Sequence, residues 1–158
     1  MKKFFLKLGE LVCIALLCVF IAYVCVQDSV SSQPFEDVEA QVVSATLTEG
    51  LTRRDALEIK KKLSLEGESY VDFVCYSSDS VMDVRELMIF KVSDARSGAA
   101  LSEKIEEYVN EKAKIFEGYA PVESSMLSSH VLKVKKGFVL FYVGEDGEAV
   151  ASAFSKSL

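Results

Sequence analysis

The run from Leu11 to Val26 constrains this chain more than any other stretch. Its sixteen residues, LVCIALLCVFIAYVCV, include no charged side chain. A helix rises about 1.5 Å per residue, so this run spans roughly 24 Å of a hydrocarbon core that is about 30 Å thick. Extending the helix back to Phe4 closes the gap. We therefore expect a transmembrane helix over residues 4–26.

The charges on either side of this run predict its orientation. Lys2, Lys3 and Lys7 precede it, and the acidic residues Asp28 and Glu36 follow it. Lysines next to a membrane span favour the cytoplasmic side. We expect a single-pass protein of the cell membrane, with its N-terminus in the cytoplasm and everything after Val26 outside.

Two alternatives to an uncleaved anchor remain open. A cleaved secretory signal has the same basic start and a somewhat shorter apolar core, and Ser29 and Ser31 offer only a weak cleavage site. A lipoprotein signal needs a small residue before a cysteine, but valine or leucine precedes Cys13, Cys18 and Cys25. In all three cases the folded part lies outside the cytoplasm.

The chain divides into an anchor or signal segment (1–27), a serine-rich linker (28–34) and one domain (35–158). The whole chain carries a net charge of −6, and its first 27 residues carry +2, so the remainder carries −8. Such an acidic domain is a poor partner for nucleic acid or for anionic lipid headgroups.

Periodic apolar residues predict the elements of the domain. The expected helices cover Phe35–Ala45, Thr52–Leu63, Ala99–Phe116, Val122–Leu127 and Glu148–Phe154. The expected strands cover Tyr70–Tyr76, Val84–Val92, His130–Lys135 and Phe138–Val143, with Lys136 and Gly137 in the last turn. For the second helix, Thr52 and Asp55 resemble an N-terminal capping arrangement.

This order of elements predicts an α+β fold. Strands joined by short turns pair antiparallel, so we expect one four-stranded antiparallel sheet with helices covering one of its faces. The FVLFYV segment has no polar residue, which indicates a central strand.

The residue content excludes most catalytic chemistry. His130 is the only histidine, so the usual serine or cysteine nucleophile would have only one candidate base. Cys75 is the only cysteine outside the apolar run, and its alternation with Val71 and Phe73 predicts a buried thiol. Asp79, Ser80 and Asp83 do not have EF-hand spacing, so we expect a plain loop. We predict no catalytic residue, no metal site and no cofactor.

Glu86 is the most unusual carboxylate because it shares its strand face with apolar residues. A buried carboxylate needs a partner to stay charged. Lys91 has the wrong parity to be that partner on the same strand, but Lys133 or Lys135 on a neighbouring strand would suit. We expect a structural pairing, with ligand contact as the alternative. Tyr119, after the long helix, packs at the core edge or anchors a partner.

Two segments carry a resemblance to a known family. SVMDVRELMIFKV (residues 80–92) and FEGYAP (residues 116–121), with an amphipathic helix between them, resemble the bacterial domain of unknown function 4358 family. The matching positions are Met82, Asp83, Glu86, Lys91, Gly118, Tyr119, Ala120 and Pro121. The resemblance covers about residues 35–154. It implies an extracytoplasmic domain held by a membrane helix or a lipid, in cells with a Gram-positive type of envelope, and it implies no activity.

These observations favour a non-catalytic binding or interaction module at the cell envelope, with Asp83, Glu86, Lys91 and Tyr119 as candidate binding residues. Its partners would be the membrane, through residues 4–26, and an envelope protein or polymer. Two alternatives remain: a carboxylate-based envelope hydrolase, and an assembly factor that acts through its transmembrane helix.

Overall fold

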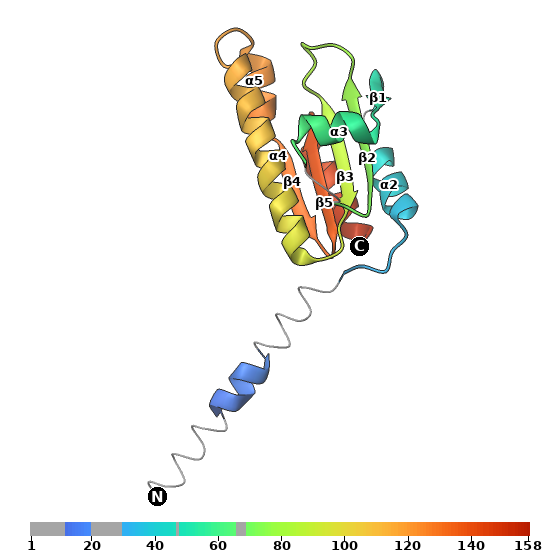
Figure 1. Ribbon diagram of the computed structural model, residues 1–158, viewed down its shortest axis with the longest axis vertical. Helices are drawn as coiled ribbons and strands as arrows, with labels where there is room; N and C mark the ends of the chain where they lie inside the picture. Colours follow the sequence, from blue (N-terminus) through green and yellow to red (C-terminus); the bar gives the residue numbers. More distant parts are fainter. Residues whose placement is uncertain (1–11, 20–29, 47, 66–68) are drawn as a thin grey trace, which may run out of the picture.

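The computed structural model describes residues 12–19, 30–46, 48–65 and 69–158, and their fold is α+β, as predicted (Figure 1). One sheet has five strands in the order β1-β2-β3-β5-β4, and every neighbouring pair is antiparallel. The strands are β1 (Leu51–Arg53), β2 (Asp72–Ser78), β3 (Glu86–Lys91), β4 (Val131–Lys135) and β5 (Phe138–Val143).

The prediction of four strands is wrong because β1 adds a fifth at one edge. Leu51 pairs with Ser78 and Arg53 with Tyr76. A strand of three residues shows too little alternation to be recognised in a sequence. Thr52 therefore looked like the start of the next helix, whereas its hydroxyl donates a hydrogen bond to Asp79 across the strand pair, at 3.0 Å.

The helix after β1 starts instead at Asp55. The Asp55 carboxylate accepts a hydrogen bond from the backbone N–H of Glu58 at 2.9 Å, and the Glu58 carboxylate accepts one from the N–H of Asp55 at 3.3 Å. This reciprocal capping box satisfies two N–H groups that a helix start leaves open. It begins α3 (Ala56–Lys62), so the predicted start at Thr52 is wrong: Asp55, three residues later, is itself the N-cap.

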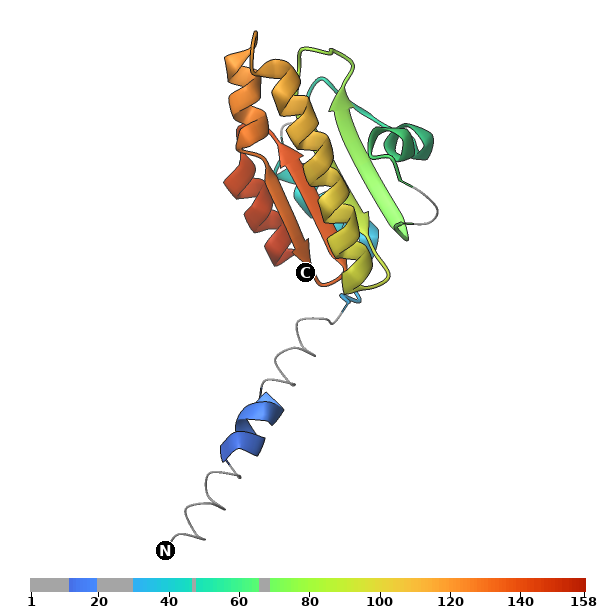
Figure 2. The same cartoon turned by 60° about the vertical axis from the view of Figure 1, so that its left-hand side comes forward.

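Helices cover both faces of the sheet, not one face as predicted (Figures 1 and 2). One core cluster joins a face of the sheet to α3, α4 (Ala95–Phe116) and α5 (Pro121–Ser128). The other cluster joins the opposite face to α2 (Phe35–Ser44) and α6 (Gly147–Lys156). The fold therefore has three layers, with the sheet in the middle. Strands β3 and β5 are buried between the two helical layers.

The turn between β4 and β5 is the predicted one. Lys136 and Gly137 both have positive φ, 48° and 78°. Two consecutive residues with positive φ form a type I′ turn, whose twist suits a two-residue hairpin. Residues 30–34, the described part of the linker, lie against this turn, since the N–H of Ser31 donates to the carbonyl of Lys136 at 2.7 Å.

Residues 12–19 of the apolar run are helical. The rest of the expected membrane helix, residues 4–11 and 20–26, lies outside the described residues, as do residues 28 and 29 of the linker. Within the part of the chain that the structure describes, no helix is both long enough and apolar enough to span a bilayer.

Candidate functional site

Glu86 is the first residue of β3 and lies between the sheet and its helices. It alternates with Met88 and Phe90, both of which belong to the core cluster under α3, α4 and α5. Alternation along a strand places all three side chains on that face. The Glu86 side chain is 1% exposed, so its carboxylate is removed from bulk water.

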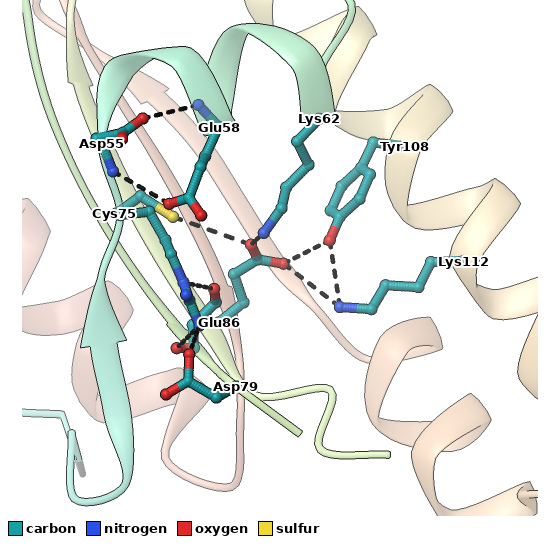
Figure 3. A network of polar contacts seen from close by, with 10 residues as sticks. Asp55, Glu58, Lys62, Cys75, Asp79, Glu86, Tyr108 and Lys112 are labelled. Atoms are coloured by element: carbon teal, nitrogen blue, oxygen red, sulfur yellow. Dashed lines mark hydrogen bonds and ion pairs between the residues drawn. The ribbon is translucent and has the colours of Figure 1, made fainter. Parts of the chain in front are cut away.

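Four side chains from three other elements surround this carboxylate, and we call the five residues the Glu86 cluster (Figure 3). Oε1 accepts from Lys62 Nζ of α3 at 2.5 Å and lies 3.9 Å from the Cys75 sulfur of β2. Oε2 accepts from the Tyr108 hydroxyl of α4 at 2.8 Å and lies 3.5 Å from Lys112 Nζ. Lys112 Nζ in turn donates to the Tyr108 hydroxyl at 3.2 Å.

The expected pairing of Glu86 is confirmed, but the expected partners are wrong. Lys62 and Lys112 take the place proposed for Lys133 or Lys135. Lys135 donates to the carbonyl of Ser155 at 2.9 Å, on the other side of the sheet. The alternation along the strand indicates the face of the sheet on which Glu86 lies. Its partners, however, are on the helices α3 and α4. No sequence pattern shows where a helix crosses a strand.

The contacts of the Glu86 cluster favour a structural role over a catalytic one. Both carboxylate oxygens accept hydrogen bonds within the cluster and the side chain is 1% exposed, so a substrate has little access to either oxygen. Burial, and then the Glu86 charge, raise the pKa of the Tyr108 hydroxyl far above its usual value. Burial, and then the same charge, raise the pKa of the Cys75 thiol to about 12. The hydroxyl and the thiol therefore stay protonated near neutral pH.

The raised pKa of Cys75 makes a testable prediction. Thiolates and not thiols react with alkylating reagents, so Cys75 in the folded chain should be alkylated at least about a hundredfold more slowly at pH 8 than in denaturant. Iodoacetamide labelling followed by mass spectrometry of the peptide that holds residue 75 measures this. Equal rates in both conditions would contradict the buried position.

The other predicted candidates do not gather around Glu86. Lys91 is at the opposite end of β3, where its Nζ donates to the carbonyl of Gln33 at 3.2 Å and lies 5.4 Å from the Phe138 ring centroid. Lys91 therefore fastens the linker to the domain. Tyr119 is 59% exposed and packs on Phe116, with ring centroids 5.5 Å apart.

The carboxylates of the loop between β2 and β3 each face an arginine. The Nε and Nη2 atoms of Arg85 donate hydrogen bonds to the Asp83 carboxylate, at distances of 2.6–3.1 Å. Arg54 Nη2 contacts Asp79 at 2.7 Å. These hydrogen bonds lower the pKa of both carboxyls, so both stay charged. Among the described residues, no three side chains of the metal-binding kinds gather into a site.

A pocket of about 330 Å³ opens at the end of the sheet away from the linker, between the β2–β3 loop, α5 and the loop after β5. Asp83 and Met82 line it from the first of these, Met126 and Glu123 from the second, and Glu145 from the third. The β2–β3 loop and the connection between α4 and α5 lie at this end of the molecule (Figure 1). Four large apolar side chains in the β2–β3 loop, in this connection and at the start of α5 are exposed: Val81, Met82, Tyr119 and Val122. We call this pocket and these four side chains the distal surface.

Both ring nitrogens of the single histidine, His130, have polar partners. His130 Nδ1 lies 2.8 Å from the carbonyl oxygen of Leu127, and Nε2 lies 3.4 Å from the Glu106 carboxylate. His130 therefore caps the end of α5 and does not face Cys75 or Glu86, which lie in the cluster described above.

A family model described as "Domain of unknown function (DUF4358)" matches residues 44–144. The chain belongs to this family. The DUF4358 match runs from the end of α2 to the residue after β5 and so includes the whole Glu86 cluster and Tyr119. It is shorter than the resemblance that the sequence suggested, and α6 lies beyond it. Comparisons with curated proteins and with solved structures gave no match.

Proposed function

We propose that this chain is a membrane-anchored, extracytoplasmic binding module of the bacterial cell envelope, without catalytic activity, and that it binds its partner through the distal surface. The apolar run at residues 11–26 and the lysines before it support the anchor and its orientation. The distal surface carries the binding part of the proposal.

The distal surface has the composition of a protein-binding site. Val81 is 87% exposed and Val122 is 67% exposed, beside a pocket with two methionines in its lining. Aromatic residues and methionines are enriched where proteins meet, and apolar groups gathered at one end of a domain mark such sites. Asp83 and Tyr119, two of the candidate binding residues, belong to this surface.

The position of the linker supports the same proposal. Residues 30–34 join the domain at the Lys136–Gly137 turn and at Lys91, at the opposite end of the sheet from the β2–β3 loop (Figure 1). A membrane anchor at that end leaves the distal surface facing away from the bilayer, where a partner can reach it.

The experiment is site-specific photo-crosslinking in intact cells with two matched positions. Val81 lies in the loop after β2, and Val71, which is 67% exposed, lies just before β2 at the other end. We expect a photoreactive residue at position 81 to give a discrete adduct that position 71 does not give. We also expect Met82→Asp to abolish that adduct.

Equal adducts at both positions, or none at position 81, would contradict the proposal. Turnover of an envelope polymer by the purified chain, lost in Asp83→Asn, would instead favour the hydrolase alternative. If an unrelated transmembrane helix replaced residues 4–26 and the adduct disappeared, the helix itself would be the binding element.

A further inference from the structure

Basic side chains gather at one corner of this acidic chain. Lys133 and Lys135 are on β4, Lys136 is in the β4–β5 turn and Lys156 is at the end of α6, and all four are exposed. Lys135 Nζ donates to the carbonyl of Ser155 at 2.9 Å, and Lys136 Nζ contacts the main-chain oxygen of Leu158 at 2.7 Å. These contacts bring the hairpin and the end of α6 together, and we call the four residues the lysine corner.

In the part of the chain that the structure describes, side-chain carboxylates do not neutralise the lysine corner. Within the described residues, none of its four ammonium groups forms an ion pair with a side-chain carboxylate. The peptide carbonyl of Ser155 that Lys135 contacts carries no full charge. Four exposed ammonium groups therefore gather on the α6 side of the hairpin, although the domain as a whole is acidic.

Acidic residues flank this corner on two sides. Glu36 and Asp37 are in the first turn of α2. That helix packs on α6 and begins beside Phe138, and from there it leans toward β2, since its Glu39 accepts a hydrogen bond from Tyr76 at 3.2 Å. Asp94 caps α4 by accepting from the N–H of Ser97 at 2.7 Å, and α4 covers the face of the sheet opposite to α6.

The linker holds the lysine corner close to the apolar run. The Ser31 N–H is bonded to the Lys136 carbonyl at 2.7 Å, and the run ends at Val26. Five residues of fully extended chain reach about 18 Å at most. The Lys91 contact to Gln33 and the stacking of Phe35 on Phe138, with centroids 6.3 Å apart, hold the next residues against the domain.

From this geometry we propose that the lysine corner lies against the phosphate headgroups of an anionic bilayer and so sets the orientation of the domain. The proposal rests on the membrane anchor proposed above. A phosphate-rich surface attracts lysines that lie within about one Debye length, roughly 8–10 Å, and tethering holds the corner near that range. The hairpin side then turns toward the lipid, while the acidic start of α2 turns away.

The test uses the full chain in vesicles and compares two labelled positions at the same end of the domain. A fluorophore at Lys136, in the corner, is compared with one at Asp37, in α2, while a quencher is attached to the lipid headgroups. In vesicles of phosphatidylglycerol we expect at least about twofold more quenching at position 136 than at position 37. In phosphatidylcholine, or in about 0.5 M salt, this difference should vanish.

A variant separates charge from shape. Lys133→Gln combined with Lys156→Gln removes two charges but keeps polar side chains there. It leaves the hairpin contacts of Lys135 and Lys136 in place and should lower the quenching at position 136 toward that at position 37. The matched control, Lys60→Gln with Lys61→Gln on α3, removes two lysines from outside the corner and should leave it unchanged. The salt and lipid comparisons use the chain without this variant, so they hold even if the variant folds poorly.

Each contrary outcome has its own meaning. Equal quenching at the two positions in both lipids, with the chain floating together with the vesicles, overturns this proposal and leaves the anchor intact. A chain that does not float with the vesicles overturns the anchor and, with it, this proposal. Binding of soluble poly(glycerol phosphate) with no lipid-dependent quenching shows an anionic polymer at the corner and overturns the assignment to lipid.

Discussion

Replacing Glu86 by alanine should destabilise the domain by about 3 kcal/mol, because it leaves Lys62 and Lys112 facing each other without the anion between them. Their side chains are 25% and 22% exposed, so water relieves the repulsion only in part. The Tyr108 hydroxyl also loses its acceptor. Urea unfolding of the chain in mild detergent, followed by circular dichroism, measures the change.

A surface pair provides the control. Lys104 Nζ contacts the Glu107 carboxylate at 2.8 Å, but both side chains are about half exposed. Exposed pairs contribute little, so Glu107→Ala should change the free energy of unfolding by less than about 1 kcal/mol. If Glu86→Ala were as mild as Glu107→Ala, the cluster would not hold α3 and α4 to the sheet.

Glu86→Gln separates charge from shape at the same position. The amide keeps an oxygen for Tyr108 but cannot balance two ammonium groups. Its loss of stability should lie between those of the alanine variant and the unchanged protein. The combined change of Glu86→Gln with Lys112→Met should recover part of that loss, because it removes one of the two uncompensated charges.

The position of Glu86 could be predicted from the sequence, but its partners Lys62 and Lys112 could not. A carboxylate at an apolar strand position is visible as a break in the alternation. Lys62 is the last of three consecutive lysines, a pattern typical of a solvated helix end, whereas α3 directs this lysine toward the sheet. Lys112 was simply one charge of many on the long helix.

The distal surface had weaker signals in the sequence. The two segments that build most of it, residues 80–85 and residues 117–122, overlap the two segments that resemble a known family. Their proximity follows from α4, which starts beside the linker end of β3 and returns the chain to the β2–β3 loop. That geometry depends on the length and direction of a whole helix, so residue patterns alone do not predict a shared pocket.

The sequence predicted helices on one face of the sheet, whereas the structure has helices on both faces. The all-apolar FVLFYV strand correctly indicated a central position, and β5 is buried at every residue. A strand that is apolar on both faces needs cover on both, yet α2 and α6 are short and lie at the two ends of the domain sequence. Each shows a helical period, but the period does not indicate the face of the sheet that a helix covers.

Phe154→Ala tests whether the second helical layer is part of the core. Phe154 of α6 is fully buried in the cluster with Phe138 and Leu140 of β5. Removing a buried phenylalanine side chain costs about 3–5 kcal/mol, through lost apolar burial and the cavity that remains. We expect a loss in that range by urea unfolding, large enough to unfold a marginally stable domain.

The neighbouring Ser152 provides the matched control on the same helix. It is exposed, so Ser152→Ala should shift the free energy of unfolding by less than about 0.5 kcal/mol. If Phe154→Ala were equally mild, α6 would not be docked on the sheet and the second face would stand open, as the one-sided fold predicted from the sequence requires. A large loss for Phe154→Ala alone means that α6, which lies outside the region that the family model matches, is still part of the folding unit.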